Sequence, residues 1–141
     1  MKIKTSLFGD IDIDDSYRIT FTSPILGFEE EKEFILIKNS NDLPFYWLQS
    51  IITPELAFFI LDPFPFFPEY NPNLTNLNEL KNIAIYVIVT IAEDFKLSTA
   101  NLIAPIIIDL DKRSAMQIVL EGSYYTTRHK LFDICDPVAV G

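Results

Sequence analysis

The sequence predicts a mostly β protein, a small antiparallel β-barrel-like single domain over residues 1–141 with at most one or two short helices. Three observations support this: apolar and polar residues alternate with a period of two, turn residues recur at short intervals, and 49% of the 141 residues are hydrophobic. Such alternation is typical of strands with one solvent-exposed face, and short strands at regular spacing are typical of a barrel or sandwich. A chain of this length can bury roughly 70% of its unfolded surface.

Period-two alternation runs through the first part of the chain and predicts several strands. Its apolar or inward-facing members are Ile3, Thr5, Leu7, Ile11, Ile13, Tyr17, Ile19 and Phe21. Gly9-Asp10 predicts the first turn, and Ser23-Pro24 with Gly27 predicts the second. A further strand is built on residues 34–37 and should end in the polar run 39–42.

The second part of the chain begins with an expected buried strand at residues 56–61. Pro63, Pro65, Pro68 and Pro72 then exclude regular pairing and predict an ordered loop. Residues 74–80 allow one short helix, with Thr75 as its cap. The remaining strands are expected at residues 83–91, 97–103, 106–110 and 116–121, and Pro105 should mark a bulge or an edge.

Charge and composition exclude several classes of function. A net charge of −9 argues against direct nucleic-acid binding, which depends on clusters of Lys and Arg, but it favours basic protein partners. Cys135 is the single cysteine, so no intramolecular disulfide can form, which fits a reducing compartment. The amino terminus does not resemble a secretory signal, and residues 83–92 are only about half as long as a membrane span. We therefore expect a cytoplasmic protein without a membrane partner.

Catalytic and metal-binding patterns are weak. Asp10, Asp12 and Asp14 have the spacing of a calcium loop, but Asp15 stands where that loop needs glycine and Phe21 where it needs glutamate. The single histidine, His129, has no neighbour at the usual ligand spacing. No nucleophile elbow or phosphate-binding glycine loop is present. The sequence therefore predicts no enzyme activity, no metal and no cofactor.

The most informative segments are LPFYWLQS at residues 43–50 and DPFPFF at residues 62–67. Aromatic side chains crowded between prolines suit packing or protein contact better than catalysis. A strand sends successive side chains to opposite faces, so at least one of Phe45, Tyr46 and Trp47 should lie outside a one-sided core. These side chains either fill the core or form an exposed apolar patch that includes Trp47 or Phe66.

In these segments the chain resembles the flagellar assembly factor FliW family. The resemblance covers almost the full length and rests on pieces in a shared order: TSLFGDIDI, LGFEEEKEF, PFYWLQS, LAFFILDPFPFFPEY, TANLIAPIII and MQIVL, with Tyr125 and Arg128-His129 behind the last. It implies a barrel-like fold and a function without catalysis. Proteins of this family bind the RNA-binding regulator CsrA, relieve its repression of flagellin mRNA translation, and also bind flagellin. The resemblance thus implies a link between flagellin synthesis and export.

Two other classes of function stay open from the residues alone. The aromatic cleft could serve a small-molecule-binding or hydrolytic β-barrel protein, or the chain could be a flagellin export chaperone without a regulatory role. The free protein is expected to be a monomer. Chemistry selects candidate partner-binding residues, aromatic ones for apolar contact and polar ones for the rim: Tyr46, Trp47, Phe64, Phe66, Phe67 and Tyr70, with Gln49, Asp62 and Glu69.

Overall fold

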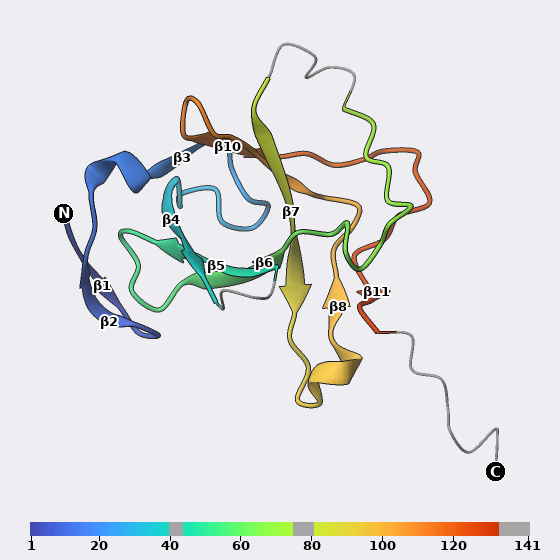
Figure 1. Cartoon of the computed structure of the whole chain (residues 1–141), viewed down its shortest axis with the longest axis horizontal. Coiled ribbons are helices and arrows are strands. Elements are labelled where there is room, and N and C mark those ends of the chain that lie inside the picture. The colour runs from blue at the N-terminus through green and yellow to red at the C-terminus, as the bar shows by residue number, and fades with distance from the viewer. Residues whose placement is uncertain (40–43, 75–80, 133–141) are drawn as a thin grey trace.

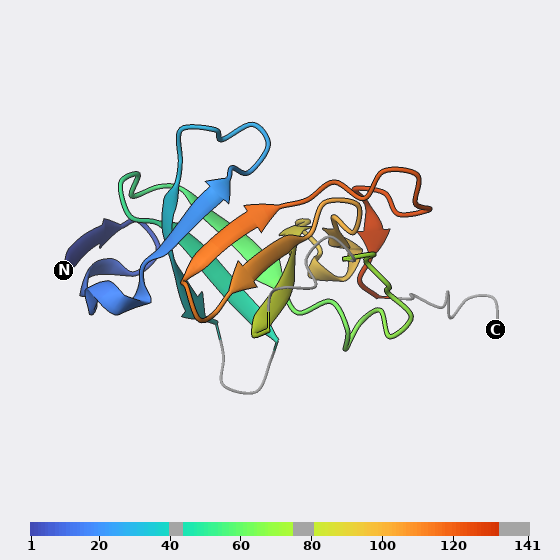
Figure 2. The ribbon, with the colours of Figure 1, turned by 90° about the horizontal axis from the view of Figure 1, so that it is seen from above.

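Seven strands close into a ring in the computed structural model, which describes residues 1–39, 44–74 and 81–132 (Figures 1 and 2). Most of these strands pair with their neighbours along the chain, and two pairings between strands distant in sequence, one antiparallel and one parallel, complete the ring. In ring order the strands are β3 (Ile19–Ser23), β4 (Glu33–Lys38), β5 (Phe45–Ser50), β6 (Ala57–Leu61), β7 (Ile83–Thr90), β9 (Ile106–Asp109) and β10 (Ser114–Gln117). The predicted barrel is confirmed.

One pairing in the ring is parallel, between β10 and β3, and the others are antiparallel. Strand direction cannot alternate all the way around a ring with an odd number of strands, so at least one pair must be parallel. The β3–β10 register also shifts between Ala115 and Met116. The irregularity that closes the barrel is therefore concentrated in this pair.

The remaining elements lie at the two ends of the molecule. The hairpin of β1 (Lys2–Thr5) and β2 (Gly9–Asp12) forms a separate sheet, and the 3₁₀ turn η1 (Asp15–Tyr17) leads from it into the barrel. At the other end, β8 (Thr99–Ala100) pairs with β7, and β11 (His129–Lys130) pairs with β8 (Figures 1 and 2). A second 3₁₀ turn, η3 (Phe95–Leu97), precedes β8.

Several predicted boundaries were wrong. Tyr17 lies in η1 rather than in a strand, because the Asp14 side chain caps that turn by accepting from Ser16 N. The strand expected at 97–103 is only Thr99–Ala100, because Asn101 accepts from Ala104 N and starts a turn. The last expected strand, at 116–121, begins and ends earlier, at Ser114 and Gln117. Of the helix expected at 74–80, all but residue 74 lies outside the described residues.

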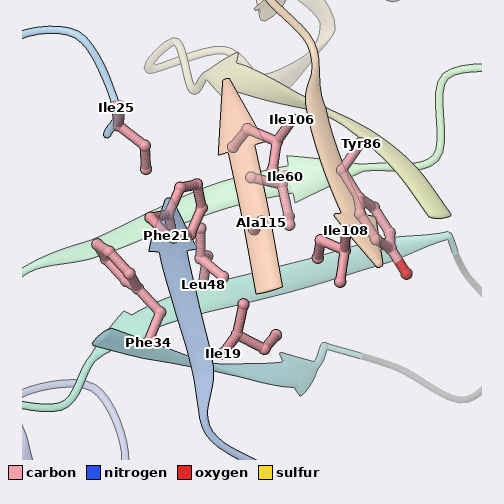
Figure 3. Packing of buried hydrophobic residues seen from close by; sticks show 10 residues of the cluster. All are labelled: Ile19, Phe21, Ile25, Phe34, Leu48, Ile60, Tyr86, Ile106, Ile108 and Ala115. Carbon is pink, nitrogen blue, oxygen red and sulfur yellow. The ribbon is translucent and has the colours of Figure 1, made fainter. Parts of the chain in front are cut away.

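The barrel interior holds the first hydrophobic core. Alternate residues of the ring strands supply it, as the period-two pattern predicts. Figure 3 shows its ten buried members between the strands: Ile19, Phe21, Ile25, Phe34, Leu48, Ile60, Tyr86, Ile106, Ile108 and Ala115.

A second core lies on the outer face of β5, β6 and β7. The residues that alternate with the interior set, Phe45, Phe59 and Val87, belong to it and are at most 7% exposed. The proline-rich loop after β6 and the segments around β8 and β11 cover this face with Tyr70, Ala100, Leu102, Leu120 and Leu131. These three strands are thus covered on both faces, as predicted for the buried strand at residues 56–61, whereas the one-sided core assumed for residues 45–47 is wrong.

Candidate functional site

An open groove of about 560 Å³ lies between the proline-rich loop and the segment that contains β11. Aromatic rings dominate its lining, and Glu69 and His129 are polar. We call it the aromatic groove, lined by Phe66, Phe67, Pro68, Glu69, Tyr70, Leu102, Tyr125 and His129.

Hydrogen bonds hold the loop side of the aromatic groove. The carbonyl of Pro63 accepts from the backbone N–H groups of Phe66 and Phe67, at 3.1 and 2.7 Å. Pro63 and Pro65 have no N–H of their own, so the loop is ordered by local turns rather than by strand pairing. This order fixes the direction in which the Phe66 and Phe67 side chains leave the backbone.

Two tyrosines connect the walls of the groove through hydrogen bonds. The Tyr70 hydroxyl donates to the carbonyl of Leu102 at 2.7 Å, and the Tyr125 hydroxyl accepts from Asn71 N at 2.8 Å. The two rings pack edge to face with centroids 4.8 Å apart. Burial raises the pKa of the Tyr70 phenol, and the neighbouring Tyr125 raises it further, so this phenol stays neutral at physiological pH.

His129 closes the far side of the groove. Its Nε2 accepts from Thr126 N at 2.8 Å, and its ring lies 6.2 Å from that of Phe67 and 6.0 Å from that of Tyr125. An imidazole nitrogen that accepts a hydrogen bond carries no proton. His129 lies in β11.

The predicted partner-binding residues fall into three places. The aromatic groove is lined by four of them, Phe66, Phe67, Glu69 and Tyr70. Tyr70 is only 5% exposed, so it forms part of the groove wall and offers little contact surface. Tyr46, Asp62 and Phe64 line a separate pocket of about 310 Å³. Trp47 and Gln49 line neither.

Gln49 does not lie at a polar rim, because it is fully buried. Its Nε2 donates to the carbonyls of Ser50, Pro54 and Leu56 at 3.0, 3.2 and 3.1 Å. The carbonyls of Pro54 and Leu56 also accept from the backbone N–H groups of Ser6 and Ser50, so Gln49 adds a side-chain donor at the β5–β6 connection. Gln49 is therefore a structural residue that orders this turn.

Trp47 and Phe66 do not form the exposed patch that the sequence suggested. Both are half-buried and pack against the second core. The Trp47 ring lies 4.9 Å from that of Phe59 and its Nε1 donates to Asn39 Oδ1, while the Phe66 ring lies 5.6 Å from that of Phe45. One face of the sheet cannot bury all of these aromatic side chains, and the second core buries most of the remaining ones.

The model of the FliW protein family matches residues 2–131. The chain belongs to the FliW family. The flagellar assembly factor FliW of Geobacillus sp. strain WCH70 is 44% identical over 139 residues, covering 94% of this chain and 96% of the relative. That of Bacillus subtilis strain 168 is 39% identical over 138 residues, covering 93% and 96%.

A solved structure agrees with this assignment. A crystal structure of the flagellar assembly factor FliW superimposes with a TM-score of 0.86 at 40% identity, covering 95% of this chain and 99% of the other. The FliW resemblance inferred from the motifs is thereby confirmed.

Sequence reasoning missed four residues of the aromatic groove: Pro68, Leu102, Tyr125 and His129. Tyr125 and His129 were noted as part of the family pattern, but they are more than fifty positions from Phe67 in the sequence. The β8–β11 pairing and the hydrogen bond from Asn71 N to the Tyr125 hydroxyl hold this segment beside the proline-rich loop.

The described residues contain neither a candidate metal-ligand group nor a helix that could span a membrane. They contain no grouping of three or more His, Cys, Asp or Glu side chains that could hold a metal ion. Within the same residues, no helix has the length and apolarity needed to cross a bilayer. Asp10 and Asp12 are exposed on β2, and Asp14 is used as a cap, with its pKa lowered by hydrogen bonds from Ser16.

Proposed function

We propose that this protein is a non-catalytic flagellar assembly factor that binds flagellin and a CsrA-type RNA-binding regulator, and relieves that regulator's repression of flagellin mRNA. The match to the FliW family over residues 2–131 carries the proposal. Both partners and the flagellin messenger are present in the cytoplasm, where we place the protein. The two proposed partners differ in chemistry, and the chain offers a surface suited to each.

The aromatic groove suits the apolar face of a flagellin terminal helix. Helix-in-groove recognition uses an apolar channel with a polar edge, and aromatic anchors usually contribute most of the affinity. Phe67 belongs to the proline-rich loop, is half-buried in the free protein and lies beside His129, so a bound helix would complete its burial. Glu69, which is exposed, would remain at the solvent edge.

Acidic side chains suit the basic regulator. The net charge of −9 steers a cationic partner toward the protein, and a regulator that binds RNA must carry Lys or Arg. Exposed acids gather on the β1–β2 hairpin, as Asp10 and Asp12, and on the β3–β4 loop, as Glu29 and Glu30. The hairpin lies at the opposite end of the molecule from β8 and β11, and thus from the aromatic groove (Figures 1 and 2). This separation supports distinct surfaces for the two partners.

A small-molecule or hydrolytic role receives less support. The groove is open, and the group in it with a strongly raised pKa is the Tyr70 phenol, which cannot act as a base near neutrality. A flagellin chaperone without a regulatory role differs only in lacking the regulator, so binding to both partners must be measured.

The test measures the affinity of purified protein for flagellin and for the regulator, with groove and control variants. Phe67→Ala should weaken flagellin binding by about 2 kcal/mol, roughly thirtyfold. Ile52→Ala, which removes an apolar side chain that is 69% exposed and absent from the groove lining, is the matched control. Circular dichroism confirms that both variants are folded at the temperature of the measurement.

The two outcomes are distinct. Equal flagellin affinity for Phe67→Ala and Ile52→Ala would reject the aromatic groove as the helix site. Failure of the wild-type protein to bind the regulator, or to restore translation of a flagellin reporter, would leave only the export chaperone.

A further inference from the structure

A second pocket, distinct from the aromatic groove, lies beside the start of β7 and the end of β6. Its volume is about 310 Å³, and three aromatic residues and one carboxylate line it together with backbone and apolar side chains of β7: Tyr46, Phe64, Tyr86 and Asp62. Trp, Tyr and Phe rings attract cations through their electron-rich faces, and a carboxylate adds a full opposite charge. We infer that this pocket is a receptor for the guanidinium group of an arginine side chain from a partner.

Tyr46 and Tyr86 form the fixed part of the pocket. They come from β5 and β7, and their rings meet edge to face with centroids 5.1 Å apart and planes at 71°. Tyr86 belongs to the barrel core, and Figure 3 shows its hydroxyl at the edge of that cluster, away from the other labelled side chains. Because the barrel wall holds both rings, little ordering is required when a ligand enters.

Asp62 supplies the charge. Its Oδ1 accepts from Phe64 N at 3.1 Å, which orients the carboxylate and places the Phe64 ring in the same pocket lining. Phe64 is 40% exposed, so part of its surface is available to a ligand. The ion pairs within the described residues involve Asp12, Asp15 and Glu33, and none involves Asp62.

The negative field of Asp62 reaches the tyrosine pair. Burial raises the pKa of the Tyr86 phenol most, Tyr46 raises it next, and the charge of Asp62 adds to the effect. Arg113 acts in the opposite direction, but its Nη2 donates to the carbonyl of Tyr17 and it does not line the pocket. The carboxylate is therefore the charge on the pocket wall.

Lys38 is the competitor for this site within the chain. It lies directly across from Tyr46 in the β4–β5 register, so both side chains leave the same face of the sheet. Lys38 is exposed and does not line the pocket. An ammonium group on a flexible stem cannot match the planar fork that guanidinium offers to a carboxylate.

The test uses a capped arginine amide as the probe and the capped citrulline amide as its neutral isostere. Nuclear magnetic resonance of the tyrosine ring signals follows both titrations in the intact protein. Arginine should shift the Tyr46 and Tyr86 signals to saturation, and citrulline should bind more weakly by about fivefold or more, since it lacks the charge. This result does not depend on which protein is the natural partner, so it stands apart from the role proposed above.

Variants separate the pocket from general charge. Asp62→Asn keeps the acceptor for Phe64 N and should remove the preference for arginine over citrulline. Glu93→Gln removes the same charge from the exposed β7–β8 connection and should leave that preference intact. Equal binding of the two probes to wild type, or equal effects of the two variants, would overturn the inference. So would arginine binding that appears only in Lys38→Met, because Lys38 would then occupy the pocket.

Discussion

Phe45 and Phe59 stack on the outer wall of the barrel, with ring centroids 5.1 Å apart and ring planes 13° apart. They are diagonal neighbours, because Phe59 pairs with Trp47 and Phe45 pairs with Leu61 in the β5–β6 register. The Trp47 ring lies 4.9 Å from that of Phe59. This arrangement explains why a chain of this size carries so many aromatic residues without exposing them all: the barrel wall has a hydrophobic core on each side.

The second core should therefore contribute strongly to stability. Phe59→Ala should lower the free energy of unfolding by about 3 to 5 kcal/mol, the usual loss for a buried aromatic. Leu26→Ala, at a side chain that is 63% exposed, should change it by less than about 0.5 kcal/mol. Urea denaturation followed by circular dichroism measures both. A loss below about 1 kcal/mol for Phe59→Ala would show that the second core is dispensable.

The free energy of unfolding should be sensitive to substitutions of Gln49 that hardly alter the shape of its side chain. Gln49→Leu removes the side-chain donor to the carbonyls of Ser50, Pro54 and Leu56, the last two of which keep a backbone donor, and should cost about 1 to 3 kcal/mol. Gln49→Glu should cost more at neutral pH, because a carboxylate would face these carbonyl oxygens.

The Gln49→Glu defect should also depend on pH. Folding raises the pKa of the new carboxyl, so the protonated form is favoured in the folded state, and stability is lost as pH rises through that folded pKa. Denaturation midpoints of the variant relative to wild type should recover toward acid pH. A constant difference across pH would contradict the burial of this side chain.

High pH should unfold the protein through its buried phenols. Burial raises the pKa values of Tyr70 and Tyr86 in the folded state. The stability that depends on the neutral phenols is complete below the unfolded tyrosine pKa of about 10 and is lost as pH rises above it. Phenolate absorbance should therefore show a late step in which the phenols of Tyr70 and Tyr86 ionise together with the loss of circular dichroism.

A variant identifies each of these phenols. Tyr86→Phe and Tyr70→Phe should each remove one phenol from the late step, whereas Tyr124→Phe, at a side chain that is 98% exposed, should leave that step unchanged. Ionisation of all six tyrosines in one step before unfolding would contradict the assignment.

Regulator binding should depend on acidic charge and weaken with salt. Glu29→Gln with Glu30→Gln should reduce the rate of association and the release of RNA from the regulator, most clearly at low ionic strength. Glu31 should be left unchanged, because its carboxylate accepts from the hydroxyls of Ser50 and Thr53 and ties two loops together.

The control removes the same charge elsewhere. Glu93→Gln with Glu121→Gln changes two exposed acids outside the β3–β4 loop. If both double variants release RNA as well as the wild type at every salt concentration, contact geometry rather than the field of the protein carries the antagonism.

The local sequence pattern was sufficient to predict many of the strands and loops of this protein. Period-two alternation predicts β1, β2 and the first ring strands, because side-chain direction in a strand depends on neighbouring residues alone. The prolines at 63, 65 and 68 predict the loop that follows β6, since a residue without an N–H cannot pair. The net charge and the shared motifs, which need no coordinates, predicted a basic partner and the FliW family.

Tertiary structure decided which residues are available. The sequence predicts that Gln49 is an exposed amide at the edge of a contact surface. In the structure, the β5–β6 connection folds over Gln49, and the carbonyls of Pro54 and Leu56 accept hydrogen bonds from its Nε2. Both faces of β5 are buried because segments distant in sequence, from Tyr70 to Leu131, cover the outer one. Phe67 and His129 meet for the same reason, through the pairing of β11 with β8. Burial and the approach of distant segments depend on the path that the connections between strands take around the closed barrel. That path is not encoded in any local pattern of residues.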